Sequence, residues 1–200
     1  MTAGTRFVAA LGLAAALAGG AALADVLVRD YDFPEKLSDH TEKGPRLEAL
    51  RGMLGFGNYR FEAGHGLVLA DGGVSDQYAV EITFRFEKVD GWQKIIDFKD
   101  RASDVGLYVY NGSLQFYPFS AGGEFRPGET YRVRLERDRA TKRVSGYLND
   151  AKVVDFDDVA DDAVFQDRKA AFFVDDLATR SEESAGEVKR IRIWDGPGGH

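Results

Sequence analysis

The chain has 200 residues, no cysteine and a formal net charge of −7 at pH 7. The lack of cysteine excludes disulfides, thiolate metal sites and cysteine nucleophiles. The acidic balance argues against nucleic acid and anionic membrane surfaces as partners, because both reward clustered Lys and Arg. The length suits one domain with a core large enough to be stable without cross-links.

The first 24 residues have the pattern of a secretory signal peptide. Arg6 is the only charged residue before Asp25, Phe7–Ala18 is an apolar run, and the segment ends in Ala22-Leu23-Ala24. A basic start, an apolar core and an A-x-A end predict cleavage after Ala24. The alternative is an uncleaved anchor, but the apolar run is shorter than the ~20 residues of a spanning helix. We therefore expect a periplasmic or secreted protein with one domain over residues 25–200 and no membrane span after cleavage.

The remainder of the chain is typical of short strands joined by turns. In Tyr78–Lys88, apolar and polar residues alternate, as in a strand with one buried and one wet face. Asn111-Gly112 is a strong hairpin signal because both residues tolerate positive φ, and Asn149-Asp150 marks a second tight turn. The other predicted strands, in chain order, are Val26–Tyr31, Tyr59–Glu62, Gly66–Ala70, Gln93–Phe98, Gly106–Tyr110, Ser113–Phe119, Thr130–Arg137, Arg143–Leu148, Lys152–Phe156, Ala170–Val174 and Lys189–Trp194.

Helix patterns are few. Pro34–Asp39 and Asp157–Phe165 each predict a turn or two of helix, and neither carries a long apolar stripe. A bulge is expected near Val188, where the alternation of the last strand is less regular. Many short strands separated by turns favour an antiparallel sandwich or jelly roll over alternating β-α units. The predicted fold class is therefore all-β.

Three segments resemble the laminin-G-like and concanavalin A-like jelly rolls. GWQKIIDFKDRASDVGLYVYNGSLQFY, residues 91–117, is similar to the family's succession of strand, polar loop, strand, Asn-Gly turn and strand. YRVRLERDRATKRVSGYLNDAKVVDF resembles the hairpin pair that follows, and AFFVDDLATRSEESAGEVKRIRIWD, residues 171–195, resembles the closing segment. The resemblance implies an antiparallel jelly-roll β-sandwich of the concanavalin A-like type. Its motifs are strand and turn patterns, so they specify fold better than function.

The catalytic signatures of this superfamily are not found in the chain. Its retaining glucanases resemble one another in a Glu-x-Asp-x-x-Glu strand, whereas the nearest pair here, Glu81 and Glu87, is six positions apart. No Gln-x-His pair of the alginate-lyase type occurs, and no G-x-S-x-G elbow. The three histidines, His40, His65 and His200, are far apart in sequence. These observations favour a protein that is not an enzyme.

Aspartates are the strongest candidates for metal binding. The segment IIDFKDRASD contains Asp97, Asp100 and Asp104, and the strand AFFVDD ends in Asp175 and Asp176. Calcium takes six to eight oxygens from carboxylates, carbonyls and water, and the resemblance implies that such loops at the sandwich rim bind it. Calcium is therefore the candidate cofactor, with Asp175 and Asp176 favoured. The alternatives are an arginine, Arg180 or Arg168, beside that pair, or aspartates that only cap turns.

Aromatic residues are the candidates for ligand binding. Alternation assigns Leu107 and Val109 to one face of a strand and Tyr108 and Tyr110 to the other. Rings exposed in a jelly-roll groove stack on the apolar C–H faces of sugars, although aromatic residues more often fill the core. The predicted ligand-binding residues are Trp92, Tyr108, Tyr110 and Tyr117.

The sequence thus predicts an exported, non-catalytic module that binds a glycan or an extracytoplasmic protein, with calcium as a candidate aid. Two alternatives remain open. One is a glycan-cleaving enzyme with an atypical pair of acids, which requires two carboxyl groups within about 5–10 Å in an open groove. The other is a structural envelope accessory, which would show a filled face and a large apolar surface patch.

Overall fold

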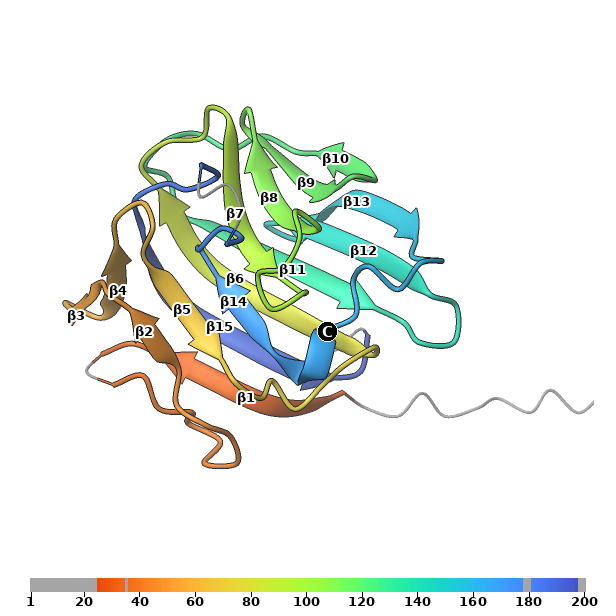
Figure 1. Cartoon of the computed structure of the whole chain (residues 1–200), viewed down its shortest axis with the longest axis horizontal. Helices are drawn as coiled ribbons and strands as arrows, with labels where there is room; N and C mark the ends of the chain where they lie inside the picture. The colour runs from red at the N-terminus through yellow and green to blue at the C-terminus, as the bar shows by residue number, and fades with distance from the viewer. Residues whose placement is uncertain (1–24, 35, 178–180, 198–200) are drawn as a thin grey trace, which may run out of the picture.

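A computed structural model describes residues 25–34, 36–177 and 181–197. These residues form two antiparallel sheets packed face to face, with one 3-10 turn, η1 (Gln166–Arg168) (Figure 1). The predicted all-β antiparallel sandwich is therefore confirmed. The predicted signal peptide, residues 1–24, lies outside the described residues and stays a prediction. Within the described part of the chain, no helix is long and apolar enough to cross a membrane.

Sheet A is the rear layer in the view of Figure 1. The last strand pairs along one side with β6 and along its other side with β4 and then β1. The spatial order is β13 (Ala151–Asp157), β12 (Arg143–Leu148), β11 (Tyr131–Arg137), β6 (Tyr78–Phe86), β15 (Gly186–Asp195), β4 (Asn58–Phe61) and β3 (Met53–Gly55), with β1 (Val26–Asp32) paired to β15.

Sheet B is the front layer. Its central strand β7 pairs with β8 on one side and with the short β14 on the other. The spatial order is β10 (Ser120–Gly122), β9 (Ser113–Tyr117), β8 (Gly106–Tyr110), β7 (Trp92–Asp97), β14 (Ala170–Phe172), β5 (Gly66–Leu69) and β2 (Glu48–Leu50).

The core lies between the sheets and is rich in aromatic rings. The period-two pattern of β6 is confirmed: Val80, Ile82 and Phe84 are buried, while the intervening Glu81 and Arg85 are partly exposed. From sheet B, β7 is buried along nearly its whole length, as expected for a strand whose outer face is also covered. The two sheets therefore bury one shared core, which fixes the register of each strand.

The predicted turns have the expected backbone. Asn111 and Gly112 both have positive φ, 47° and 78°, and so do Asn149 and Asp150, 47° and 72°. Two positive values at the central positions match the twist of the flanking strands. A register shift between Val188 and Arg190 confirms the predicted bulge in the last strand.

Two expectations about local structure are wrong. Residues 158–165 form irregular turns instead of a helix, because the buried Asp158 carboxylate accepts the backbone N–H groups of Asp162 and Ala163 and pairs with Arg137. The described residues of Pro34–Asp39 are likewise not helical. The strands β2, β3 and β10 were not predicted, since three residues are too few to show a period.

Candidate functional site

An aromatic cluster lies on the outer face of sheet B. β7 and β8 pair so that Trp92 is opposite Tyr110 and Lys94 is opposite Tyr108. The residues that alternate with them on β8 belong to the core, so these four point outward. Tyr117 of β9 lies on the same face. The four residues predicted to bind ligand are therefore brought together: Trp92, Tyr108, Tyr110 and Tyr117.

Trp92 is the centre of this aromatic cluster. Its ring stacks on that of Tyr110 with centroids 3.9 Å apart, and it meets the rings of Tyr108 and Tyr117 edge-on at 5.3 Å each. Such pairs are worth roughly 0.5–1.5 kcal/mol beyond their burial, so the rings hold one another in place. Tyr108 is buried and Tyr117 is 37% exposed, which puts the first at the floor of the cluster and the second at its rim.

Two loops border the aromatic cluster, one between β7 and β8 and one between β14 and β15. The Arg101 side chain of the first loop donates through Nε to the Asp175 carbonyl of the second at 2.7 Å. The backbone N–H of Lys94 donates to the Glu182 carbonyl at 3.0 Å, where β14 has ended and left β7 without a partner strand. The second loop is thus held both to the first loop, through Arg101, and to β7, through Lys94.

The carboxylates of Asp97 and Asp175 are fully buried and build these loops. Asp97 accepts the backbone N–H groups of Lys99 and Arg101 at 3.0 and 2.7 Å. Asp175 accepts the N–H groups of the residues at positions 176, 181 and 182 at 2.8–3.0 Å. Backbone amides thus occupy oxygens that the sequence prediction assigned to calcium, and metal binding by these two residues stays a prediction.

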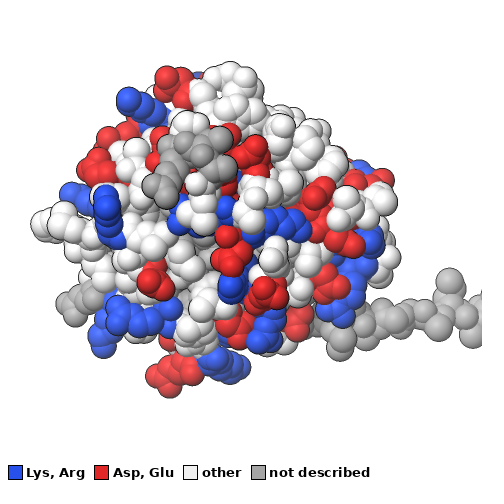
Figure 2. All heavy atoms as spheres, viewed as in Figure 1, with Lys and Arg blue, Asp and Glu red and all other residues white. Residues whose placement is uncertain are grey.

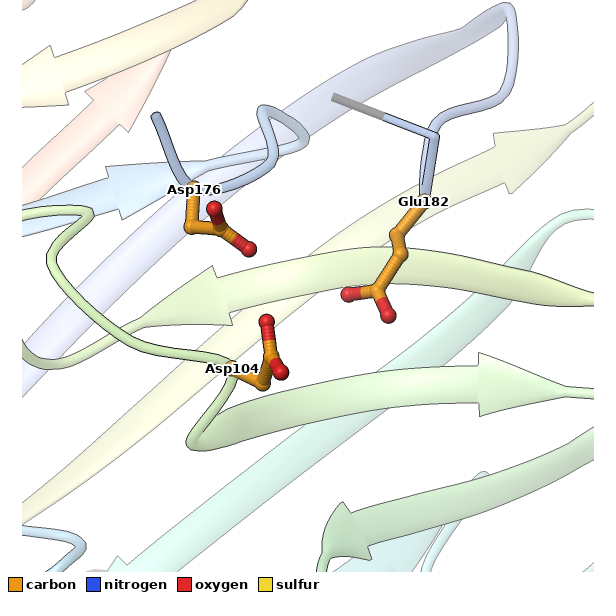
Figure 3. Close-up of side chains that lie close together, drawn as sticks. All are labelled: Asp104, Asp176 and Glu182. Carbon is orange, nitrogen blue, oxygen red and sulfur yellow. The ribbon is translucent and has the colours of Figure 1, made fainter. Parts of the chain in front are cut away.

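Three other carboxyl groups converge beside the aromatic rings, and we call them the acidic triad: Asp104, Asp176 and Glu182 (Figure 3). One oxygen of each lies within 4.8 Å of the others. Asp104 and Asp176 were among the predicted metal ligands. Asp100, predicted with them, instead pairs with Lys169 at 2.6 Å on the surface. Glu182 was not predicted, because only the path of the loop brings it to the triad.

Lys94 supplies a buried cation beneath the acidic triad. Its ammonium group donates to the Tyr108 hydroxyl at 2.5 Å and lies 3.4 Å from the Asp97 carboxylate. The Tyr108 hydroxyl in turn donates to the backbone carbonyl of Asp104 at 2.6 Å. A chain of polar contacts therefore runs from the buried Lys94 ammonium group through the Tyr108 hydroxyl to the loop that carries Asp104.

The environment favours the protonated forms of Glu182 and Asp104. Burial is the main cause that raises the pKa of Glu182 to about 7, and the nearby Asp175 carboxylate adds to it. A hydrogen bond with Asp176, followed by burial, raises the pKa of Asp104. Burial also raises the pKa of Tyr108, helped by the negative charge of Glu182. Carboxyl groups this close cannot all ionise freely, so they share protons or attract a cation.

The aromatic cluster and the acidic triad meet in a pocket of about 100 Å³, lined by Trp92, Asp104, Tyr108, Tyr117 and Glu182. This volume is below the roughly 300–1,000 Å³ of sites that enclose drug-sized ligands. The pocket therefore accepts one end or one edge of a ligand, with the remainder on the surface. Figure 2 shows acidic and basic side chains interspersed over the viewed face of the molecule.

Calcium fits this pocket in part. The acidic triad offers up to six carboxylate oxygens, which is within the range that calcium takes. The Lys94 ammonium opposes a cation, because its positive charge acts on both Glu182 and Asp104. Of the arginines proposed as alternatives, Arg168 pairs with Asp71 at 2.9 Å, and Arg180 lies outside the described residues.

Among the described residues, the other acids and histidines weighed in the sequence lie apart from the pocket. Glu81 pairs with Arg192 across sheet A, and Glu87 is exposed at the end of β6. His40 donates its backbone N–H to the Asp30 carbonyl in a loop beside β1. His65 lines a separate groove of about 520 Å³ next to β4 and β15. His200 lies outside the described residues.

Comparison with solved structures finds similar β-sandwich domains at low sequence identity. Domain 4 of AbnA, a GH43 extracellular arabinanase from Geobacillus stearothermophilus in complex with arabinotriose, matches with a TM-score of 0.66 and 16% identity over 88% of this chain and 95% of that one. The CBM40 of the Ruminococcus gnavus IT-sialidase, bound to α2,3-sialyllactose, matches with a TM-score of 0.54 and 12% identity over 70% and 90%.

A third similar structure is the Trypanosoma rangeli sialidase with 2,3-difluorosialic acid, with a TM-score of 0.63 and 10% identity over 86% of this chain and 30% of that one. At these identities the likeness shows the fold alone, an antiparallel β-sandwich. No protein-family model matches the sequence, and no curated protein matches it significantly.

Proposed function

We propose that this protein is a non-catalytic glycan-binding domain whose ligand enters the pocket between the aromatic cluster and the acidic triad. The observation that carries the proposal is the position of the rings of Trp92 and Tyr117 directly beside the carboxyl groups of Asp104 and Glu182. Aromatic rings take the apolar C–H faces of sugars, and carboxylates accept hydrogen bonds from sugar hydroxyls. One small pocket thus offers both kinds of contact that a sugar requires.

The size of the pocket supports binding of a terminal or single sugar unit. Its volume of about 100 Å³ leaves most of an oligosaccharide on the surface. The domains of the arabinanase and of the CBM40, whose structures contain arabinotriose and sialyllactose, support carbohydrate binding only through a shared fold. An extracytoplasmic protein that presents hydroxyl and apolar groups is the other partner class.

We also propose export to the periplasm or the medium, on the basis of the N-terminal pattern from Arg6 to Ala24. N-terminal sequencing of the protein recovered from an expressing cell tests this. An N-terminus at Asp25 supports cleavage, whereas retention of residues 1–24 in a membrane fraction supports the anchor instead.

Glycan binding is tested by calorimetric titration of neutral and charged oligosaccharides against the wild type and Tyr117→Ala. Tyr117 is at the rim, so its removal takes away stacking surface with little disturbance of the core. We expect the affinity to fall about two- to tenfold, since stacking on an aromatic ring is worth roughly 0.5–1.5 kcal/mol. Trp92→Ala should have a larger effect, because Trp92 holds the other three rings.

The matched control is Phe56→Ala. Phe56 is 93% exposed at the turn between β3 and β4 on sheet A. The substitution therefore removes an exposed ring from a different surface. Equal loss of affinity in Phe56→Ala and Tyr117→Ala would contradict binding at the pocket. Failure of every oligosaccharide to bind would overturn the glycan proposal and direct attention to protein partners.

A second candidate function, glycoside hydrolysis, is favoured by the geometry of the acidic triad. Retaining glycosidases place two carboxyl groups about 5–5.5 Å apart, one as nucleophile and one as general acid. The triad brings its oxygens within 4.8 Å, and the pKa of Glu182, raised to about 7, suits a general acid at neutral pH. In this alternative Glu182 is the acid and Asp104 or Asp176 the nucleophile.

Chromatography of oligosaccharides after long incubation separates the two functions. Hydrolysis predicts shorter products with the wild type and none with Glu182→Gln, which keeps the shape of the side chain but cannot exchange a proton. Binding without any product from oligosaccharides that the protein demonstrably binds supports the non-catalytic function.

A further inference from the structure

We propose that the pocket selects among glycans by charge: it prefers sugars that carry a protonated amine, binds neutral sugars less tightly and rejects acidic sugars. This inference rests on the proposed glycan binding and adds a substrate class to it. Its basis is the placement of charge relative to the rings, because the same aromatic walls would otherwise accept a neutral or a charged sugar alike.

The walls of the pocket are acidic. Among the described residues that line it, Asp104 and Glu182 are acids and no residue is basic. Asp176 reaches to within 4.8 Å of both through its carboxyl oxygens. A ligand that stacks on Trp92 or Tyr117 therefore presents its substituents to carboxyl groups, and a protonated amine is the substituent that pairs best with them.

One hydrogen-bond acceptor in the pocket wall, the Oε2 atom of Glu182, can accept a hydrogen bond from a ligand. The Oε2 atom of Glu182 is buried, and none of the described residues gives it a hydrogen bond. A buried acceptor without a partner carries a free-energy cost that a donor from a ligand removes. An ammonium group has three donors and a positive charge, so it satisfies this oxygen and offsets the charge of the neighbouring acids together.

The buried cation near the pocket, Lys94, is not positioned to bind the ligand. Lys94 is buried to about 1% exposure, and its ammonium is engaged with the Tyr108 hydroxyl and the Asp97 carboxylate. It lies below the Tyr108 ring and is not among the residues that line the pocket. A sugar carboxylate would therefore add a further acid to this crowded group, with no cation positioned to receive it, which makes acidic sugars unfavourable ligands.

A cation in the acidic triad has two possible sources, the amine of the sugar or a calcium ion that binds sugar hydroxyls. The two differ in whether added metal matters. An amine binds in the presence of a chelator, whereas calcium-bridged binding is lost there and is open to neutral sugars.

The test uses two matched pairs of ligands in calorimetric titrations at neutral pH with EGTA. Deacetylated chitotriose and chitotriose differ in their amines, and α2,3-sialyllactose and lactose differ in one acidic residue. We expect the deacetylated trisaccharide to bind about tenfold tighter than its acetylated form, the ratio that a charge-assisted hydrogen bond gives. We expect sialyllactose to bind more weakly than lactose.

Two variants locate the effect. In Asp104→Asn the ratio between the deacetylated and acetylated trisaccharides should fall toward one. Asp100→Asn is the matched control, because Asp100 is in the same loop but pairs with Lys169 outside the triad, so it should keep the wild-type ratio. If both variants lose the preference equally, the effect comes from the net charge of −7 and not from the pocket.

The outcomes separate this inference from the function beneath it. Binding of all four ligands with equal affinity, or tighter binding of sialyllactose, overturns the charge selection and leaves glycan binding standing. Binding that appears only when calcium replaces EGTA overturns the amine and assigns the cation to the metal. Binding of none of the four overturns the proposed function together with the inference.

Discussion

Two buried ion pairs of this sandwich differ in how completely the acids around them are hydrogen-bonded and paired with cations. In the first pair, Arg137 donates to Asp158 at 2.7 Å, and both side chains are buried. The Asp158 carboxylate also accepts two backbone N–H groups, from Asp162 and Ala163. In the second pair, Lys94 lies 3.4 Å from Asp97, with the acidic triad above it.

The difference shows which region holds the fold together and which is open to a ligand. Around Arg137 the neighbouring acid is held ionised, since Lys142 and Arg137 lower the pKa of Asp161. In the pocket the pKa of Glu182 is raised to about 7, and one of its oxygens has no partner among the described residues. A satisfied buried pair specifies structure, whereas an under-satisfied group in a pocket is a candidate for function.

The largest effect is expected from breaking the satisfied pair with Arg137→Met. This change leaves the Asp158 carboxylate buried without its cation, and loss of one partner of a buried pair costs about 3–5 kcal/mol. Urea denaturation followed by circular dichroism measures the free energy of unfolding. Arg139→Met is the control, because Arg139 is exposed and pairs with Asp76 at the surface, where such pairs are worth about 0–1 kcal/mol. Similar losses in the two variants would refute the structural role of the buried pair.

A smaller effect, of opposite sign, is expected from Glu182→Gln in the pocket. The pKa of Glu182 is about 7 in the folded protein and 4.5 for the unperturbed group, so the folded state binds the proton more tightly than the unfolded state. Stability from this group is fully present below pH 4.5 and is lost as the pH rises through 7. Glu182→Gln removes this dependence, so it should melt higher than the wild type at pH 8 and about equally at pH 5.

The comparison of the two melting profiles isolates Glu182 together with the acids of the triad that share its protons, because all other groups are common to both proteins. The difference in melting temperature between the variant and the wild type should grow between pH 5 and pH 8. A difference of about zero over the whole range would show that the pKa of Glu182 is not raised by folding and would remove the contrast with the Arg137 region.

The sequence predicts the framework of this molecule well, for a physical reason. Period-two alternation in Tyr78–Lys88 and the Asn-Gly turn at residues 111 and 112 are local patterns, and local patterns fix strands and hairpins. The helix expected over Asp157–Phe165 is absent because a distant residue, Arg137, draws Asp158 inside and shapes the turns around it. No local pattern encodes that contact.

The candidate site divides in the same way. The aromatic cluster could be predicted, since Tyr108 and Tyr110 share a face by alternation and Trp92 follows from pairing in a hairpin. The acidic triad could be predicted only in part, because Asp104 and Asp176 belong to different loops and Glu182 joins them through the path of the second loop. Loop residues meet by tertiary contacts, which the spacing of residues in a sequence does not record.

The smallest effect on stability is expected from added calcium. This test bears on the comparison of the two regions, because a bound metal ion would neutralise the acidic triad as Arg137 neutralises Asp158. The Lys94 ammonium opposes a second cation, so we expect weak binding. A calcium concentration equal to the dissociation constant adds about 0.4 kcal/mol to stability, which raises the melting temperature by about 1–2 °C. Thermal unfolding with calcium, with magnesium and with EGTA measures this, and Asp104→Asn should remove the calcium-dependent part while Asp100→Asn keeps it. If calcium still raises the melting temperature of Asp104→Asn, the ion binds outside the acidic triad. If calcium does not raise the melting temperature of the wild type at any concentration, the triad does not bind calcium, and its carboxyl groups interact only with protons and with the ligand.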